Sequence, residues 1–440
     1  MRGKYKFYIW IVGFVSMFLH GKTDAQQALY PLLEKKSWSQ VLEENEYKWH
    51  PPYTINLLIH PLHSSDWIYL NPSMVVSRRH VIRNISSTNF EQRKKAESQE
   101  DLVVQFAFDN PPFIPDFRLT NLRLAEDKYP VATADYFAND IYYKIEYAAT
   151  VLDDSQTLLC LRVGAKNESD KIKQIMIRSK IGSYSENKMF DYHYIPYRWT
   201  NEKWKDYDQV VLKEHSIYKG QQLIGEVVSE NMNLFWEEKK SYTDKEYEDI
   251  LYPQVWYGSG YVTPEFRVKD MHRVVCAMKE VQPNDSAFFV LKLLVNDSLI
   301  TSFHEESLKQ LTFKDVKEKA IADFKVPFTD KTLKTEFKRD EWEDLFCSLQ
   351  LSTLQLLVND FQNKMYQPAQ GGSSERFFVW VFEAVQMLRP MLRTGQFESV
   401  KKSLDYIFSL QDAGFPPVGK FTTTSGAIGT TGPRWANTTG

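Results

Sequence analysis

The sequence of 440 residues has few cysteines, no excess of positive charge and no long apolar run. Cys160, Cys276 and Cys347 lie far apart, so neither a disulfide framework nor a CxxC-type metal site is expected, and these residues should pack in the core. Lys and Arg total 54 against 57 Asp and Glu, which removes most support for nucleic-acid binding. No GxSxG, HExxH, P-loop or GxGxxG motif in a strand–helix context supports a serine hydrolase, a zincin or a nucleotide-dependent enzyme.

The sequence is rich in aromatic residues, which make up 14% of it and include 24 Tyr and 11 Trp. Such a composition favours a β-rich protein, or one that offers flat apolar faces to a ligand. With 43% hydrophobic residues, the chain is long enough for two or three domains.

The N-terminus is typical of an export signal. Arg2, Lys4 and Lys6 precede an apolar run, 7–19, and small residues follow at Thr23–Ala25. This pattern predicts a signal peptide over residues 1–25, and therefore a periplasmic or secreted protein. The run is shorter than the roughly 20 residues that span a bilayer, so an uncleaved anchor is the weaker alternative, and no stable membrane anchor is expected after cleavage.

After an N-terminal segment, 26–52, the pattern is that of an antiparallel β-protein. Ile141, Tyr143, Ile145 and Tyr147 alternate with polar or exposed positions, as in a strand with one buried face. Further strand-like runs occupy 157–163, 173–177, 209–212 and 288–295. No fixed-period repeat indicates a propeller or a solenoid. We therefore expect a large β-sandwich domain over residues 53–300.

The periodicity becomes helical after residue 300, where a helical linker is predicted over 301–340. From Trp342 the apolar positions follow the i, i+3, i+4, i+7 spacing of an amphipathic helix, which Leu354, Leu356 and Leu357 extend.

Two more helices, 375–393 and 396–410, are predicted to form an αα-hairpin across a turn at Gly395. Pro390 should kink the first of them or end it early. The apolar side of this helix is expected to be buried and consists of Phe377, Trp380, Val381, Ala384, Val385, Leu388 and Leu392.

Three segments carry a resemblance to a known family: Gly371–Arg376 with Trp380, then Phe408–Asp412, then Gly429–Trp435. Together with the order of sandwich, linker and αα-hairpin, they resemble the six-hairpin glycosidases, whose catalytic domain is an (α/α)6 toroid. The resemblance covers residues 50–440 in architecture and 371–440 in motif. It implies that residues 341–440 are the start of an incomplete toroid, because such a toroid has twelve helices. The chain is thus expected to be an N-terminal fragment of an exported glycoside hydrolase.

The resemblance places Glu375, Arg376 and Trp380 at the mouth of a sugar-binding cleft. Glu375 could equally be a charge favoured at the start of a helix, and Trp380 could belong to the core. Trp435 is predicted to stack on a sugar ring. Hydrogen-bond donors for the sugar are predicted to be Gln411, Arg434 and Asn437.

Catalysis of this type needs two carboxylates that flank the scissile bond. Related enzymes carry the general acid and its partner on later hairpins, so no catalytic residue is assigned here. Neither an organic cofactor nor a metal is expected, and the fragment by itself should be inactive. The alternatives are a non-catalytic carbohydrate-binding or structural protein and, with less support, a polysaccharide lyase or a sugar phosphorylase.

One short segment outside the hairpin region combines titratable residues. His60 and His63 flank Pro61, and Asp66 follows closely. The spacing permits a metal site, but a solvated turn is the favoured interpretation.

Overall fold

The computed structural model describes a chain with a β-rich first part and a helical last part. The described residues are 57–70, 75–80, 101–110, 112–113, 115, 121–153, 156–184, 204–206, 210–238, 273–296, 300–328, 332–333, 336–360, 364–369, 379 and 381–411. The predicted signal peptide and the N-terminal segment 26–52 lie outside them. Among the described helices, none combines the length and the apolar character needed to cross a membrane.

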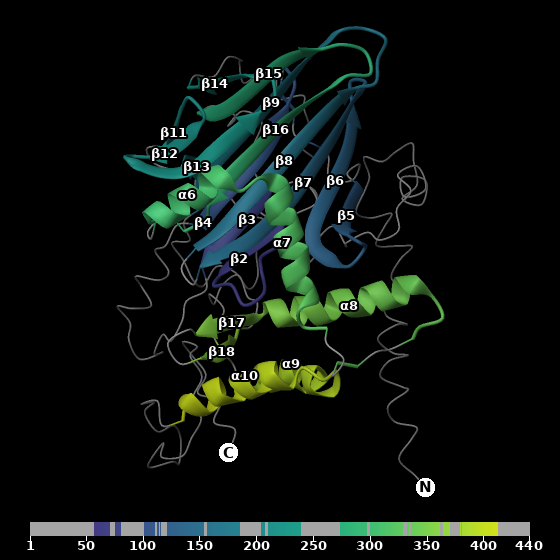
Figure 1. Ribbon diagram of the computed structural model, residues 1–440, viewed down its shortest axis with the longest axis vertical. Helices are drawn as coiled ribbons and strands as arrows, with labels where there is room; N and C mark the ends of the chain where they lie inside the picture. Colours follow the sequence, from purple (N-terminus) through teal and green to yellow (C-terminus); the bar gives the residue numbers. More distant parts are fainter. Residues whose placement is uncertain are drawn as a thin grey trace.

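Two antiparallel sheets of eight strands each form the first part (Figure 1). The first sheet has the order β1 (Leu57–Leu58), β2 (Asp66–Leu70), β3 (Val76–His80), β4 (Asp101–Phe108), β9 (Lys173–Tyr184), β15 (Val274–Val281) and β14 (Asn233–Glu237), with β10 (Trp204–Asp206) paired to β9. The second sheet has the order β11 (Val210–Lys213), β12 (Ser216–Lys219), β13 (Gln222–Ser229), β16 (Ser286–Leu294), β8 (Gln156–Asn167), β7 (Ile141–Asp153), β6 (Tyr129–Ala138) and β5 (Asn121–Ala125). The predicted arrangement of sheets first and helices afterwards is confirmed.

The main core lies between the two sheets and is built from alternating positions of their strands. Tyr143, Ile145 and Tyr147 of β7 all enter it, as the alternation predicts. Phe108 of β4 stacks on Tyr143 across the interface, with 4.4 Å between ring centroids. The aromatic residues of the sequence thus serve in part to fill this sandwich.

Helices α6 (Ser302–Gln310) and α7 (Phe313–Lys325) cover the outer face of the second sheet, as a third layer (Figure 1). Each begins with a capping box, from Thr301 and Thr312 respectively, which satisfies amide groups of the first turn. A second core lies between these helices and the sheet. Its members come from both layers and, in Leu351, from the helix that follows: Tyr129, Val131, Ala148, Leu158, Cys160, Leu223, Leu294, Leu308, Val316, Ala320, Phe324 and Leu351. The sheet therefore buries both of its faces.

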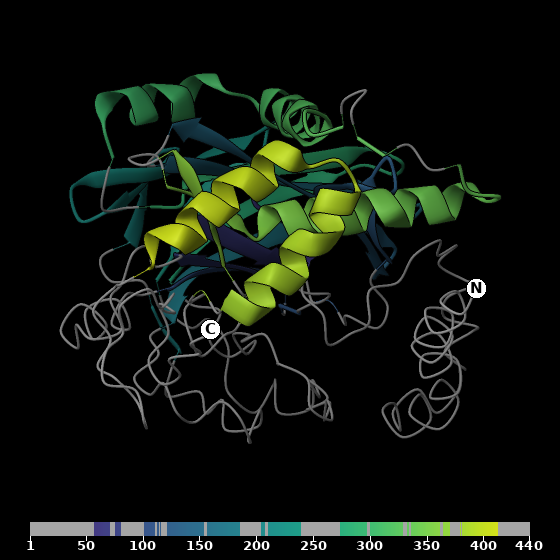
Figure 2. The same ribbon diagram turned by 90° about the horizontal axis from the view of Figure 1, so that it is seen from below.

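The last part of the described chain lies at one end of the sandwich. Helix α8 (Asp340–Gln355) leads into a hairpin of β17 (Leu357–Asp360) and β18 (Met365–Pro368), and helices α9 (Val381–Arg393) and α10 (Phe397–Ser409) follow. Seen from below, α9 and α10 form the outermost layer under α8 (Figure 2). They meet through a shared core, and Gly395 between them has a φ of 87°, so the predicted αα-hairpin with its glycine turn is confirmed.

Three sequence predictions about these helices are wrong. Helix α8 ends at Gln355, and Leu357 begins a strand instead of extending the helix. Helix α9 begins at Val381, after the non-helical Val379, and not at 375, and it continues through Pro390 to its predicted end at Arg393. Its outer side exposes Val385 and Leu392, because the buried face is shifted and uses the positions Val381, Ala384, Leu388 and Met391.

The cysteines behave largely as predicted. All three are free, and Cys160 and Cys276 are fully buried, whereas Cys347 is partly buried. Burial raises the pKa of the Cys160 thiol to about 12, which makes it unreactive at neutral pH.

Candidate functional site

The predicted sugar-binding residues fall mostly outside the part of the chain that the structure describes. Glu375, Arg376, Trp380, Arg434, Trp435 and Asn437 all lie there. Gln411 is described: it follows α10, is exposed, and its backbone N–H donates to the Phe408 carbonyl at 3.0 Å. Its side chain lies at the end of the αα-hairpin and is accessible to a ligand.

Glu383 is an acidic residue of the αα-hairpin with an unusual environment. It lies in the first turn of α9, and its Oε2 is shielded from water without a hydrogen-bond partner among the described residues. A buried carboxylate oxygen of this kind is destabilising unless something binds it. The position of Glu383 at the start of a helix partly offsets this cost, because the helix dipole favours a negative charge there.

The sandwich is joined to the helical part by a buried contact of the loop between β1 and β2. The side-chain Nε2 of Gln355, at the end of α8, donates to the His60 carbonyl at 2.6 Å. His60 is fully buried, stacks on Trp67 with 5.5 Å between centroids, and donates from Nδ1 to the Pro61 carbonyl at 2.9 Å. Burial lowers the pKa of His60 to about 4, so the ring is neutral at pH 7.

His63 extends this buried contact between the sandwich and the helical part to the β17–β18 hairpin. Its Nδ1 donates to the Leu357 carbonyl at 3.1 Å, and its ring stacks on Tyr366 at 4.1 Å. The Lys402 ammonium of α10 lies 4.7 Å from the centre of the same tyrosine ring. Burial also lowers the pKa of His63 to about 4. The predicted turn is present, but the prediction that it is solvated is wrong, because His60 and Asp66 are buried between the two parts.

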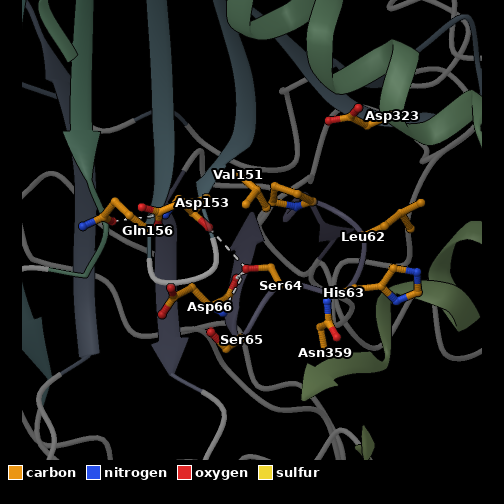
Figure 3. A pocket seen from close by; sticks show the side chains of 12 residues that line it. Leu62, His63, Ser64, Ser65, Asp66, Val151, Asp153, Gln156, Asp323 and Asn359 are labelled. Carbon is orange, nitrogen blue, oxygen red and sulfur yellow. Dashed lines mark hydrogen bonds between the residues drawn. The ribbon is translucent and has the colours of Figure 1, made fainter. Parts of the chain in front are cut away.

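A cavity of about 260 Å³ opens beside this contact between the sandwich and the helical part, and we call it the junction pocket. Four segments converge on it (Figure 3). Its lining residues are Pro61, Leu62, His63, Ser64, Ser65 and Asp66 from the first loop, Val151, Asp153, Gln156 and Thr157 from β7 and β8, Asp323 from α7, and Asn359 from β17. Asp323 and Asn359 lie at opposite ends of this group of side chains (Figure 3).

One side of the junction pocket is held by a hydrogen-bond network. Gln156 donates from Nε2 to the Asn296 carbonyl at 2.7 Å, and its Oε1 accepts from the Asn296 N–H at 3.0 Å. Asp153 accepts from Nε2 of His304 at 2.7 Å. The other nitrogen of that ring, Nδ1, accepts the Thr301 N–H of the α6 capping box at 3.1 Å, which fixes the tautomer. These bonds make this wall rigid.

Three other lining groups have no hydrogen-bond partner among the described residues: the Ser65 hydroxyl, the Asn359 carboxamide and the Asp323 carboxylate. Burial raises the pKa of Asp323, and the nearby Lys319 opposes that change. None of the three could be predicted from the sequence, because no local pattern links residues so far apart in the chain.

These side chains do not form a metal-binding site. In the ranges that the structure describes, no three His, Cys, Asp or Glu side chains are arranged to hold a metal ion. Comparison with known protein families and with curated proteins found no match to this chain.

Proposed function

We propose that this chain belongs to an exported glycoside hydrolase of the six-hairpin type. The enzyme acts on an oligosaccharide or polysaccharide by carboxylate acid–base catalysis. The observation that carries the proposal is the order of the folded parts: a large antiparallel sandwich, two capped helices packed on it, and then an αα-hairpin. The glycine-rich motifs that flank this hairpin, 371–376 and 429–435, agree with it.

The exposed apolar side chains of the hairpin support the toroid. Val385 and Leu392 on α9, and Phe397 and Phe408 on α10, all point to solvent, the last with 58% of its surface exposed. In a ring of hairpins each helix pair packs against the next, which would cover such residues. Trp342 of α8 is similarly exposed, at 53%.

The chemistry of the hairpin loops suits a sugar. A pyranose has apolar C–H faces and hydroxyl groups at its rim, so it is bound by an aromatic face together with hydrogen-bond donors. Trp435 offers the face, and Arg434 and Gln411 offer donors. Glu375 and Arg376, which precede α9 in the sequence, would bind hydroxyl groups.

Carbohydrate binding without catalysis is the second candidate function. It is favoured by the junction pocket between the sandwich and the helices, because a lining of polar and apolar groups suits a neutral ligand. A lyase or a phosphorylase has no comparable support.

Substrate-binding variants test the hydrolase proposal. In the protein made from the whole open reading frame that contains these codons, Trp435→Ala should raise KM for the best glycoside about tenfold, the loss of roughly 1.4 kcal/mol of stacking. Phe137→Ala, which changes an exposed aromatic side chain of β6 on the sandwich, is the control and should leave KM unchanged. An active enzyme with equal KM in both variants would remove Trp435 from the site. An inactive protein on every glycoside would overturn the hydrolase.

A further inference from the structure

The junction pocket has the size of a site for one small molecule. Its volume of about 260 Å³ lies just below the roughly 300–1,000 Å³ of most small-molecule sites, so a ligand would be about as large as a single sugar ring. The first loop, the β7–β8 connection, α7 and β17 all contribute to it. The pocket is therefore a product of the fold, assembled where the sandwich meets the helices.

The unpartnered polar groups of the pocket favour a ligand with several hydroxyl groups. Ser65 is only 8% exposed, yet its hydroxyl has no partner among the described residues. The Asn359 carboxamide can both donate and accept, and the Asp323 carboxylate accepts. A ligand with hydroxyl groups can bond to these groups in place of water.

The charges around the pocket exclude an anionic ligand. Asp66 forms an ion pair with Arg78 at 2.7 Å, Asp153 accepts a hydrogen bond from His304 at the same distance, and Asp323 has no ion-pair partner among the described residues. Lys and Arg are missing from the lining residues in the described part of the chain. Lys319 lies nearby, but its Nζ donates to the Val151 carbonyl at 2.8 Å.

Apolar groups complete the lining. Pro61, Leu62 and Val151 stand beside the polar side chains, so the pocket offers both an apolar surface and hydrogen-bonding groups. A neutral sugar matches this combination because its ring has C–H faces and a hydroxyl rim. A metal ion does not match it, since the ligand set described above is missing.

We propose that the junction pocket binds one neutral sugar residue. Asp323 and Asn359 bond to its hydroxyl groups from opposite ends, and Ser65 bonds to it from the first loop. This binding does not depend on the proposed hydrolysis, because none of the residues predicted to bind substrate lines the pocket.

Calorimetric titration of the 440-residue chain with glucose, galactose, mannose, xylose and rhamnose tests the proposal. At least one sugar should bind saturably, and Asp323→Ala and Asn359→Ala should each weaken it about tenfold, the worth of one to two hydrogen bonds. Glu318→Ala removes an exposed carboxylate of the same helix, and Asn233→Ala removes an exposed amide, so both controls should bind like the wild type.

Hydrogen exchange of the wild-type chain gives a second readout that needs no variant. The bound sugar should slow exchange in 61–66 and 151–157, and leave 222–229 unchanged. The proposal is overturned if no neutral sugar binds, if only glucosamine or glucuronate binds, or if binding survives both pocket variants. None of these results bears on sugar release by the hydrolase, which is measured separately.

Discussion

The side-chain amide of Gln355 donates to the His60 carbonyl at 2.6 Å, although 295 positions separate the two residues in the sequence. The bond joins the end of α8 to the first loop of the sandwich, and both residues are fully buried. It therefore couples the helical part to the β-sandwich at the side of the junction pocket.

Replacement of Gln355 by alanine should destabilise the protein. The His60 carbonyl would lose its donor while it stays buried, which costs about 1–3 kcal/mol. Urea unfolding followed by tryptophan fluorescence measures this loss. Gln386→Ala removes an exposed glutamine from α9 and should change the free energy of unfolding by less than about 0.5 kcal/mol. Equal stability of the two variants would show that the buried bond does not join the parts.

Acidification should weaken the same contact between the sandwich and the helical part. The pKa of His60 is about 4 in the folded protein and near 6.5 when unfolded, so the unfolded state binds the extra proton between these values. Stability is complete above about pH 6.5 and falls as the pH drops towards 4, by roughly 3 kcal/mol for this residue. The lowered pKa of His63 adds a loss in the same direction.

Urea unfolding from about pH 7 to about pH 4.5 measures this dependence. In His60→Asn the slope with pH should be shallower, whereas in His215→Asn, a variant of an exposed histidine, it should equal that of the wild type. A slope that is unchanged in the His60 variant contradicts the assignment of the lost stability to this ring.

Two glycines of the second sheet should respond oppositely to alanine. A Cβ at Gly225 would lie 2.6 Å from Cδ2 of Leu293 and 2.7 Å from the Lys292 carbonyl oxygen, both on the neighbouring strand β16. Such overpacking should lower the free energy of unfolding by about 1–3 kcal/mol. A Cβ at Gly164 would meet nothing closer than 3.8 Å, so Gly164→Ala should keep or slightly raise the melting temperature. A tolerated Gly225→Ala would mean that β13 and β16 are not packed this closely.

A buried lysine should anchor α6 to the sheet. The Lys292 ammonium bonds to the carbonyl oxygens of Leu308 and Leu311 at the end of α6 and forms an ion pair with Glu226. Loss of one partner of a buried ion pair lowers the free energy of unfolding by about 3–5 kcal/mol. For Lys292→Met the loss should lie near the lower end of this range, because Glu226 remains 21% exposed and keeps some hydration. Thermal unfolding checks this value against Lys166→Met, which removes an exposed lysine of β8. Similar melting temperatures for the two variants contradict the anchoring role.

The sandwich could be predicted from the sequence because its signal is local. On β7 every second residue enters the core, and the alternation of Ile141, Tyr143, Ile145 and Tyr147 is visible without any tertiary information. The amphipathic spacing that marks α8 and α10 is local in the same sense. Errors arose where packing decides the outcome: the buried face of α9 includes Met391 and leaves Leu392 exposed.

The junction pocket could not be predicted for the opposite reason. Asp66, Asp153, Asp323 and Asn359 come from four segments that only the packing of helices on the sandwich brings together. The histidines of the loop between β1 and β2 form a visible local pattern with Pro61 and Asp66, but this pattern does not reveal that α8 and β17 cover them. Of the predicted sugar-binding residues, Gln411 alone lies in the described part of the chain.

The most direct test of the proposed function is a comparison of two proteins on one panel of aryl glycosides and plant polysaccharides. One is the 440-residue chain, and the other is the product of the whole open reading frame that contains it. We expect the second protein to release reducing sugar from at least one substrate, with retention or inversion of the anomeric configuration set by its carboxylate pair. Failure of both proteins to release sugar from any substrate would contradict the hydrolase and favour a carbohydrate-binding protein.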